Sequence, residues 1–101
     1  MVTDSIDVLC LNVCGLKSIL LYSDFRDLIA SKDILIFLES KSDEFDVFDV
    51  PSGYCFFAKN RSNLSKKSGG IVIVYKESLT KYLNFPKSSS EFVQWLIIQK
   101  R

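Results

Sequence analysis

The order of apolar and polar positions along the chain predicts a strand, a helix and a second strand. The run at 6–13 is apolar and rich in β-branched residues, and the run at 34–38 is continuously apolar, as buried strands are. Between them, from 18 to 30, the apolar residues are spaced for one helix face: Leu21, Phe25, Leu28 and Ile29. Ser23 is the expected N-cap of this helix. Together these elements predict a βαβ unit with two parallel strands.

The rest of the chain carries strand patterns and no helix signal. Four further segments are expected to form strands: 54–58, 71–75, 81–85 and 91–99. Strands that follow one another after a βαβ unit favour antiparallel pairing, so we predict an α/β fold of the α+β kind, built on a mixed sheet. A single helix covers this sheet in the prediction, which makes the fold look unfinished.

The composition fits one compact domain or a piece of one. The chain has 101 residues, of which 48% are hydrophobic, and its 13% aromatic content excludes a disordered protein. No apolar run reaches the roughly 18–20 residues that a membrane helix needs. The first residues include acidic side chains and no basic one, unlike a signal peptide. We therefore expect a cytoplasmic or nuclear protein with no membrane partner.

Histidine is absent, and the three cysteines are an odd number. The missing histidine removes the commonest general base, the histidine-activated nucleophiles and the usual zinc ligand. The three cysteines, Cys10, Cys14 and Cys55, lie among apolar residues and lack C-x-x-C spacing. We interpret them as small buried hydrophobic side chains rather than redox or metal-binding groups.

Charge is divided unevenly between the two halves of the chain. Residues 1–50 contain four Lys or Arg and ten Asp or Glu, whereas residues 51–101 contain nine and two. An acidic half joined to a basic half is compatible with a metal site beside a phosphate-binding surface. Two solvated faces that attract each other would give the same pattern.

Asn12 and Glu39 are the candidate chemical groups, because each stands at the carboxyl end of a predicted parallel strand. Open α/β sheets bind their ligands at that edge. A carboxylate that ends an apolar strand suits a hard cation such as Mg²⁺, and an asparagine beside it can orient a ligand by hydrogen bonding. The alternative is structural: Glu39 is the first solvated loop residue, and Asn12 precedes the turn at Gly15.

These segments resemble the motifs of the endonuclease/exonuclease/phosphatase superfamily. Residues 11–16 (LNVCGL) resemble its opening motif, and residues 33–41 (DILIFLESK) are similar to its second motif, an apolar strand that usually ends in Gln-Glu-Thr. The next strands of the family resemble 53–54, 68–75 and 91–96, in the same order. The resemblance covers nearly the whole chain, and it is closest to the endonuclease domain of non-LTR (LINE-type) retrotransposons.

The resemblance implies a Mg²⁺-dependent phosphodiesterase that cuts a nucleic-acid strand, with DNA as its partner. It makes Glu39 a catalytic residue and the metal ligand, and Asn12 a second catalytic group of the same site. The metal would neutralise charge on the scissile phosphate while an activated water attacks in line. It also implies the N-terminal half of a four-layer α/β sandwich. The inner sheet face is then uncovered, and the chain is expected to self-associate through it.

The chain also departs from the family pattern. Leu38 stands where Gln is usual and Cys14 where a polar residue is common, which affects how a substrate would be oriented. The family's catalytic Tyr, its Asp-x-Asn pair and its Asp-His dyad belong to later segments. We therefore expect 1–101 to be a partial domain, truncated at its C-terminal end. Such a chain would bind Mg²⁺ weakly or not at all and would be inactive.

Two other functions remain open from the sequence. The stretch 59–67 lacks acidic residues and predicts a non-catalytic nucleic-acid-binding module that contacts phosphates through four basic residues: Lys59, Arg61, Lys66 and Lys67. Phe56, Phe57 and Tyr75 lie inside predicted strands and are interpreted as core residues rather than base-stacking platforms. The third alternative is an interaction protein that binds no nucleic acid.

Overall fold

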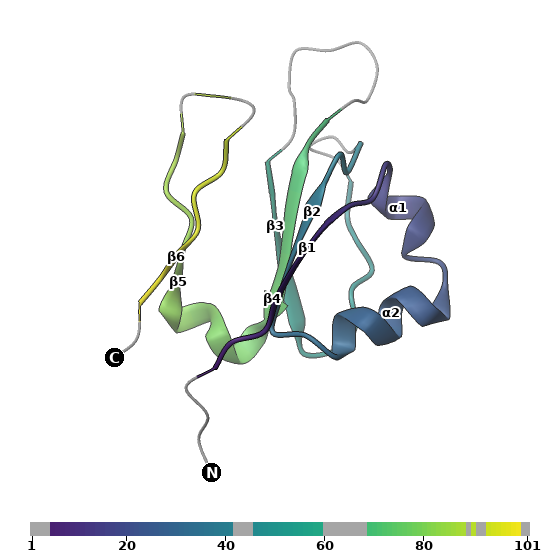
Figure 1. Ribbon diagram of the computed structural model, residues 1–101, viewed down its shortest axis with the longest axis horizontal. Coiled ribbons are helices and arrows are strands. Elements are labelled where there is room, and N and C mark those ends of the chain that lie inside the picture. Colours follow the sequence, from purple (N-terminus) through teal and green to yellow (C-terminus); the bar gives the residue numbers. More distant parts are fainter. Residues whose placement is uncertain (1–4, 42–45, 60–68, 89, 91–92, 100–101) are drawn as a thin grey trace.

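The computed structural model describes residues 5–41, 46–59, 69–88, 90 and 93–99, and it has a mixed α/β architecture (Figure 1). The elements in chain order are β1 (Val8–Asn12), α1 (Leu16–Ile19), α2 (Ser23–Ala30), β2 (Ile34–Leu38), β3 (Tyr54–Lys59), β4 (Ile71–Lys76), the 3₁₀ helix η1 (Glu77–Tyr82), β5 (Leu83–Asn84) and β6 (Ile97–Ile98). In the described part of the chain, no helix has the length and apolar character needed to cross a membrane.

Four strands form the central sheet, in the order β1-β2-β4-β3. Strands β1 and β2 run parallel, and Asn12 lies opposite Leu38 in their register. Strand β4 is antiparallel to both of its neighbours, β2 and β3. This arrangement confirms the predicted mixed sheet, with one parallel βαβ pair followed by antiparallel strands.

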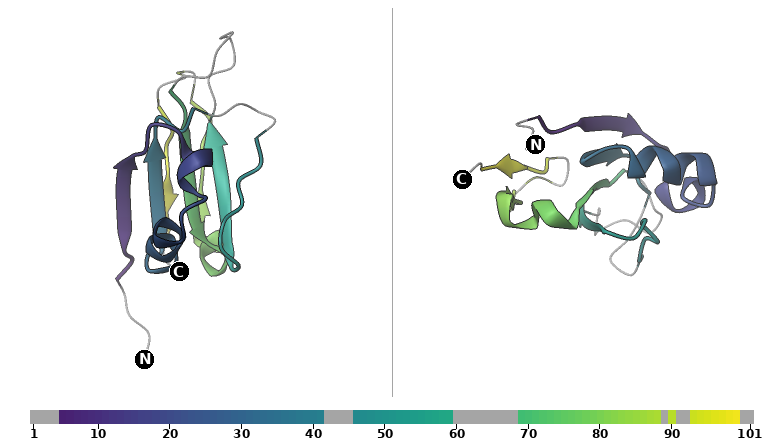
Figure 2. Two further views of the ribbon diagram at one scale, coloured as in Figure 1. Left: turned by 90° about the vertical axis from the view of Figure 1, so that its right-hand side faces the viewer. Right: turned by 90° about the horizontal axis from the view of Figure 1, so that it is seen from below.

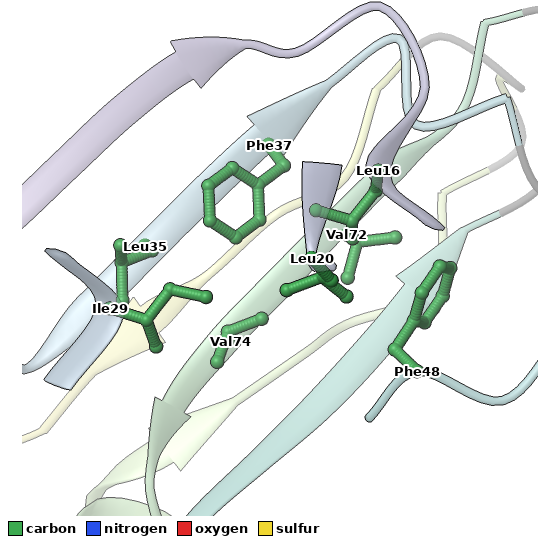
Figure 3. Close-up of a cluster of buried hydrophobic side chains, with 8 residues drawn as sticks. All are labelled: Leu16, Leu20, Ile29, Leu35, Phe37, Phe48, Val72 and Val74. Carbon is green, nitrogen blue, oxygen red and sulfur yellow. The ribbon is translucent and has the colours of Figure 1, made fainter. Parts of the chain in front are cut away.

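The hydrophobic core lies between this sheet and the two helices (Figure 3). Alternate residues of β2 and β4 face the helices, and eight buried side chains form the cluster: Leu16, Leu20, Ile29, Leu35, Phe37, Phe48, Val72 and Val74. The ring of Phe37 also contacts that of Phe25, at 5.4 Å between centroids. Full burial of such a side chain contributes about 1.5–3 kcal/mol, so this layer supplies much of the folding free energy.

The predicted single helix over 18–30 is wrong, because the chain forms two helices there. Leu16 and Leu20 are four residues apart and both buried, so they anchor α1 to the sheet. The chain then turns, and Leu21 is 84% exposed rather than on the apolar face. Helix α2 begins at Ser23 with Tyr22 as its N-cap residue, so Ser23 does not have the expected capping role.

The second face of the sheet is covered only in part. Over β3 and β4, the ring of Phe85 stacks on Phe57 at a centroid distance of 4.4 Å and lies 5.5 Å from Tyr75. Over β1 the face is open, and Val8 is 50% exposed. The β5–β6 pair lies on the opposite side of the sheet from α1 and α2 (Figures 1 and 2). Strand β5 is shorter than the predicted segment 81–85 because η1 occupies its start, and β6 covers two residues of the predicted segment 91–99, of which 91–92 lie outside the described residues.

The cysteines are not the buried side chains that the sequence predicted. Cys10 and Cys14 are exposed, and Cys55 is half-buried. Cys10 is exposed because β1 is an edge strand whose alternate residues face the open part of the second face. Cys14 belongs to the turn after β1 and has a φ of 49°. Apolar neighbours in the sequence therefore do not indicate burial at a sheet edge.

Candidate functional site

Asn12 and Glu39 meet where β1 and β2 end. The Asn12 Nδ2 atom donates a hydrogen bond of 2.6 Å to Glu39 Oε2, and both residues are exposed to solvent. The predicted juxtaposition of the two side chains is thereby confirmed. Their catalytic and metal-binding roles remain predictions.

The meeting depends on an unusual backbone conformation at Glu39. Asn12 and Leu38 are opposite each other in the parallel register, so they share a face of the sheet. A Glu39 in extended conformation would send its side chain to the other face. Instead Glu39 has a φ of 53°, and its carbonyl accepts a 2.8 Å hydrogen bond from the Gly15 N–H. The left-handed turn lets the carboxylate reach Asn12.

Neighbouring segments hold this corner of the sheet, which consists of residues 12–16, 39–41 and 69–70. Ser40 is buried, and its carbonyl accepts a hydrogen bond of 3.0 Å from the Leu16 N–H. On the other side, the Ser40 and Lys41 N–H groups donate to the carbonyls of Gly70 and Gly69, at 3.3 and 2.8 Å. The corner is therefore tied both to the start of α1 and to the start of β4.

Backbone strain is concentrated in the same corner. Within the described ranges, three non-glycine residues have positive φ, and all three lie here: Cys14, Glu39 and Lys41. Each such residue costs on the order of 1–2 kcal/mol and persists only where the surrounding structure enforces it. Strained residues of this kind cluster at functional sites.

The predicted basic stretch begins at the same end of the sheet. Lys59 is opposite Ile71, Ile71 is opposite Leu38, and Leu38 is opposite Asn12. Three strand spacings separate Asn12 from Lys59, about 14 Å. The Lys59 Nζ donates to the Ser88 carbonyl at 3.1 Å. The other members of the stretch, Arg61, Lys66 and Lys67, lie outside the described residues.

Sequence reasoning missed three residues of the corner: Ser40, Lys41 and Gly70. Ser40 and Lys41 come directly after the candidate carboxylate, and Gly69-Gly70 comes directly before the strand predicted at 71–75. The pair of glycines was the available signal, because adjacent glycines allow another backbone to approach closely. In the structure the carbonyls of the two glycines accept hydrogen bonds from the N–H groups of the two residues that follow Glu39.

The pair offers few protein ligands to a metal ion. No group of three or more His, Cys, Asp or Glu side chains that could hold a metal occurs among the residues that the structure describes. Glu39 accepts the Asn12 hydrogen bond on Oε2, which leaves Oε1 and the Asn12 Oδ1 as oxygen donors. Mg²⁺ is often bound through one or two carboxylates, with water and substrate phosphate completing the shell. The residues present fit that mode of binding.

A second carboxylate, Asp33, lies at the opposite end of β2. Its Oδ2 accepts a 2.8 Å hydrogen bond from the Asp7 N–H, and its Oδ1 pairs with Lys76 Nζ at 3.0 Å. The backbone hydrogen bond from Asp7, together with Lys76, lowers the pKa of Asp33, and the hydrogen bond to Asp33 raises the pKa of Lys76. Burial raises the pKa of the nearby Tyr54 hydroxyl, which donates to the Lys32 carbonyl.

A shallow cavity lies beside this ion pair, lined by Ser52, Gly53, Tyr54, Lys76, Glu77 and Ser78. Its lysine already has a partner, because Lys76 pairs with Asp33, and the backbone of the cavity is held by the Glu77 N–H, which donates to the Gly53 carbonyl at 2.8 Å. The Asp33–Lys76 pair at this end therefore stabilises the fold. The corner with Asn12 and Glu39 is the better candidate site.

Comparison with known proteins adds no assignment to this geometry. No protein-family model matches the chain, and no curated protein matches it.

Proposed function

We propose that the corner holding Asn12 and Glu39 is the metal-holding part of a Mg²⁺-dependent phosphodiesterase site that acts on DNA. The observation that supports it is the 2.6 Å hydrogen bond from Asn12 to a Glu39 carboxylate held in a left-handed turn. The proposal places the chain in the N-terminal part of an endonuclease/exonuclease/phosphatase domain of the retrotransposon type. The β5–β6 pair is then the beginning of the second sheet of the sandwich, and a cytoplasmic or nuclear location suits a DNA substrate.

Glu39 and Asn12 have separate roles in this proposal. Glu39 supplies the negative charge, and its Oε1 is directed to the cation because Asn12 engages Oε2. Asn12 is neutral, so its hydrogen bond orients the carboxylate without cancelling the charge. When bound, Mg²⁺ supplies neutralisation of the negative charge on a phosphodiester.

The proposal does not extend to strand cleavage by these 101 residues. The chain has no histidine, and no group of three or more His, Cys, Asp or Glu side chains that could hold a metal occurs among the described residues. An attacking water thus has no assigned base. We expect no Mg²⁺-dependent nicking of supercoiled plasmid above that of the Glu39→Ala variant. Nicking that disappears in Glu39→Ala would contradict the inactivity of the chain while supporting the site.

Metal binding is the direct test of the site. Mn²⁺, a paramagnetic substitute for Mg²⁺, should broaden the NMR signals of Asn12 and Glu39 at millimolar concentration, because so few protein ligands are available. The Glu39→Ala variant should lose this broadening. Glu77→Ala removes an exposed carboxylate at the other end of the sheet and should keep it. Equal broadening in the wild type and in Glu39→Ala would refute the proposal.

A second candidate function is nucleic-acid binding without a metal. Lys59 supports it, because it stands at the same end of the sheet as Asn12. DNA affinity should then fall steeply with salt, and alanines at Lys59, Arg61, Lys66 and Lys67 should reduce both the affinity and the salt slope. Glu39→Ala should leave the affinity unchanged. Salt-independent DNA binding would contradict phosphate contact through these basic residues, and the absence of DNA binding would favour the interaction protein that binds no nucleic acid.

Self-association through the open part of the second sheet face is a further expectation. Val8 is the test position, because it is 50% exposed on the edge strand β1. Sedimentation velocity should show an oligomer that Val8→Lys weakens and Leu21→Lys does not. Leu21 is also an exposed apolar residue, but it lies between the two helices. A monomer at every concentration would contradict this expectation.

A further inference from the structure

Gly70 lies against the corner at a point where no side chain fits. A Cβ atom built on Gly70 would lie 2.5 Å from the Ser40 Oγ, far closer than atoms approach without a bond. The next nearest atoms, the Lys41 nitrogen and the Lys59 carbonyl oxygen, would both be 3.8 Å away, which is ordinary contact. The side chain of Ser40 alone therefore occupies the space that a residue at position 70 would need.

Ser40 has little freedom to move out of that space. Its side chain is almost fully buried, with 1% of the residue exposed. Its carbonyl accepts from the N–H of Leu16, a core residue, and its own N–H donates to the carbonyl of Gly70. A group at position 70 would therefore either rotate the Ser40 side chain inside its buried site or displace the backbone of residues 39–41.

Displacement of that backbone would act directly on Glu39. The peptide joining Glu39 to Ser40 carries the carbonyl that Gly15 binds at 2.8 Å. The same peptide sets the left-handed conformation at Glu39, which brings its carboxylate within 2.6 Å of Asn12 Nδ2. Both contacts depend on where Ser40 sits.

We propose that Gly70 is a positioning residue for Glu39, acting through the buried side chain of Ser40. The absence of a side chain at position 70 lets Ser40 pack against β4, and Ser40 in turn fixes the direction of the Glu39 carboxylate. The inference rests on the proposed function for its importance to metal binding. The effect of Gly70 on the direction of the Glu39 carboxylate does not depend on that function and can be measured without metal.

The test compares two glycine-to-alanine substitutions that share one source of strain. Gly70 has a φ of 92° and Gly53 a φ of 87°, so an alanine is disfavoured at either position for the same backbone reason. A Cβ at Gly53 meets nothing within 4 Å, whereas a Cβ at Gly70 meets Ser40. Gly53→Ala is therefore the control for backbone strain without the clash.

The side-chain amide signals of Asn12 in NMR spectra provide the readout without metal. Gly70→Ala should shift them, and Gly53→Ala should not. Adding Ser40→Ala to Gly70→Ala removes the clashing oxygen and should return the signals to those of Ser40→Ala alone. Unshifted Asn12 signals in Gly70→Ala, or no recovery in the double variant, would overturn the proposal.

Mn²⁺ broadening at Asn12 provides the second readout. Substitutions that misplace a metal ligand through its supporting contacts cost about 10–100-fold in metal affinity, and Gly70→Ala should fall in that range. If the amide signals respond as expected but Mn²⁺ binds nowhere near Glu39 in the wild type, the positioning role stands and the proposed function fails.

A milder substitution covers the case in which Gly70→Ala prevents folding. Ser40→Cys keeps glycine at position 70 and replaces the Ser40 Oγ, which lies beside Gly70, with a larger sulfur atom. It should shift the Asn12 amide signals in a folded chain. Signals identical to those of the wild type would overturn the proposal as well.

Discussion

The two ends of β2 each carry a carboxylate, and the two carboxylates differ in the charge of their bonding partners. Asp33 precedes the strand and is bound by a backbone N–H and by Lys76, with its pKa lowered. Glu39 follows the strand and is bound by the neutral amide of Asn12. One strand of five residues thus separates a carboxylate whose charge is balanced by a lysine from one whose bonded partner has no charge.

The backbone conformation also differs between the two ends. At the Asp33 end, the Lys76 N–H and the Asp33 carbonyl form an ordinary hydrogen bond of 3.0 Å. At the Glu39 end, Cys14, Glu39 and Lys41 all have positive φ, which is costly for residues with a side chain. A fold that needed only to end a strand would not require this conformation. The difference separates a carboxylate that stabilises the fold from one that the fold holds at a conformational cost.

The largest expected effect is on stability. Asp33→Ala should lower the free energy of unfolding by about 1–2 kcal/mol, because the Asp7 N–H and Lys76 lose their acceptor at a partly exposed site. Glu39→Ala should change it by less than about 0.5 kcal/mol, since Glu39 is exposed. Urea denaturation at neutral pH measures both. Equal losses would remove the distinction between the two ends.

Acid should remove the stabilising contribution of Asp33, with a smaller effect. The pKa of Asp33 is lowered in the folded chain, so its contribution is present above the unfolded pKa and disappears as the pH falls through the folded value. The loss therefore lies below about pH 4. Urea midpoints measured from pH 3 to 6 should fall less steeply below pH 4 in Asp33→Ala than in the wild type. Leu21→Ala changes an exposed side chain that does not titrate, so it is the control and should keep the wild-type slope.

The fold was predictable wherever apolar residues form continuous runs. The strand predicted at 34–38 has the bounds of β2, and those at 54–58 and 71–75 end one residue short of β3 and β4. The helical region was not predictable to the same degree. The spacing of Leu16 and Leu20 is as helical as that of Phe25 and Ile29, and periodicity alone does not show where one helix ends and the next begins.

The candidate site was predictable in position and not in conformation. Parallel strands bring their carboxyl ends to one edge, and that rule was enough to place Asn12 near Glu39. The positive φ of Glu39 depends on hydrogen bonds from residues distant in sequence, including that from Gly15. Local patterns assign such a conformation to glycine, so neither the turn nor the role of Ser40 could be read from the sequence.

The smallest expected effect comes from making the two ends alike. Asn12→Lys places a cation beside Glu39, as Lys76 stands beside Asp33. An exposed ion pair is worth little, so the free energy of unfolding should rise by no more than about 0.5 kcal/mol. Mn²⁺ broadening near Glu39 should nevertheless disappear, because the ammonium group both occupies the carboxylate and repels the metal. Asn12→Gln keeps a neutral amide and should retain part of the broadening. If Asn12→Lys binds Mn²⁺ as the wild type does, the charge of the bonded partner does not distinguish the two ends of β2. The strained backbone around Glu39 would then be the remaining difference between them.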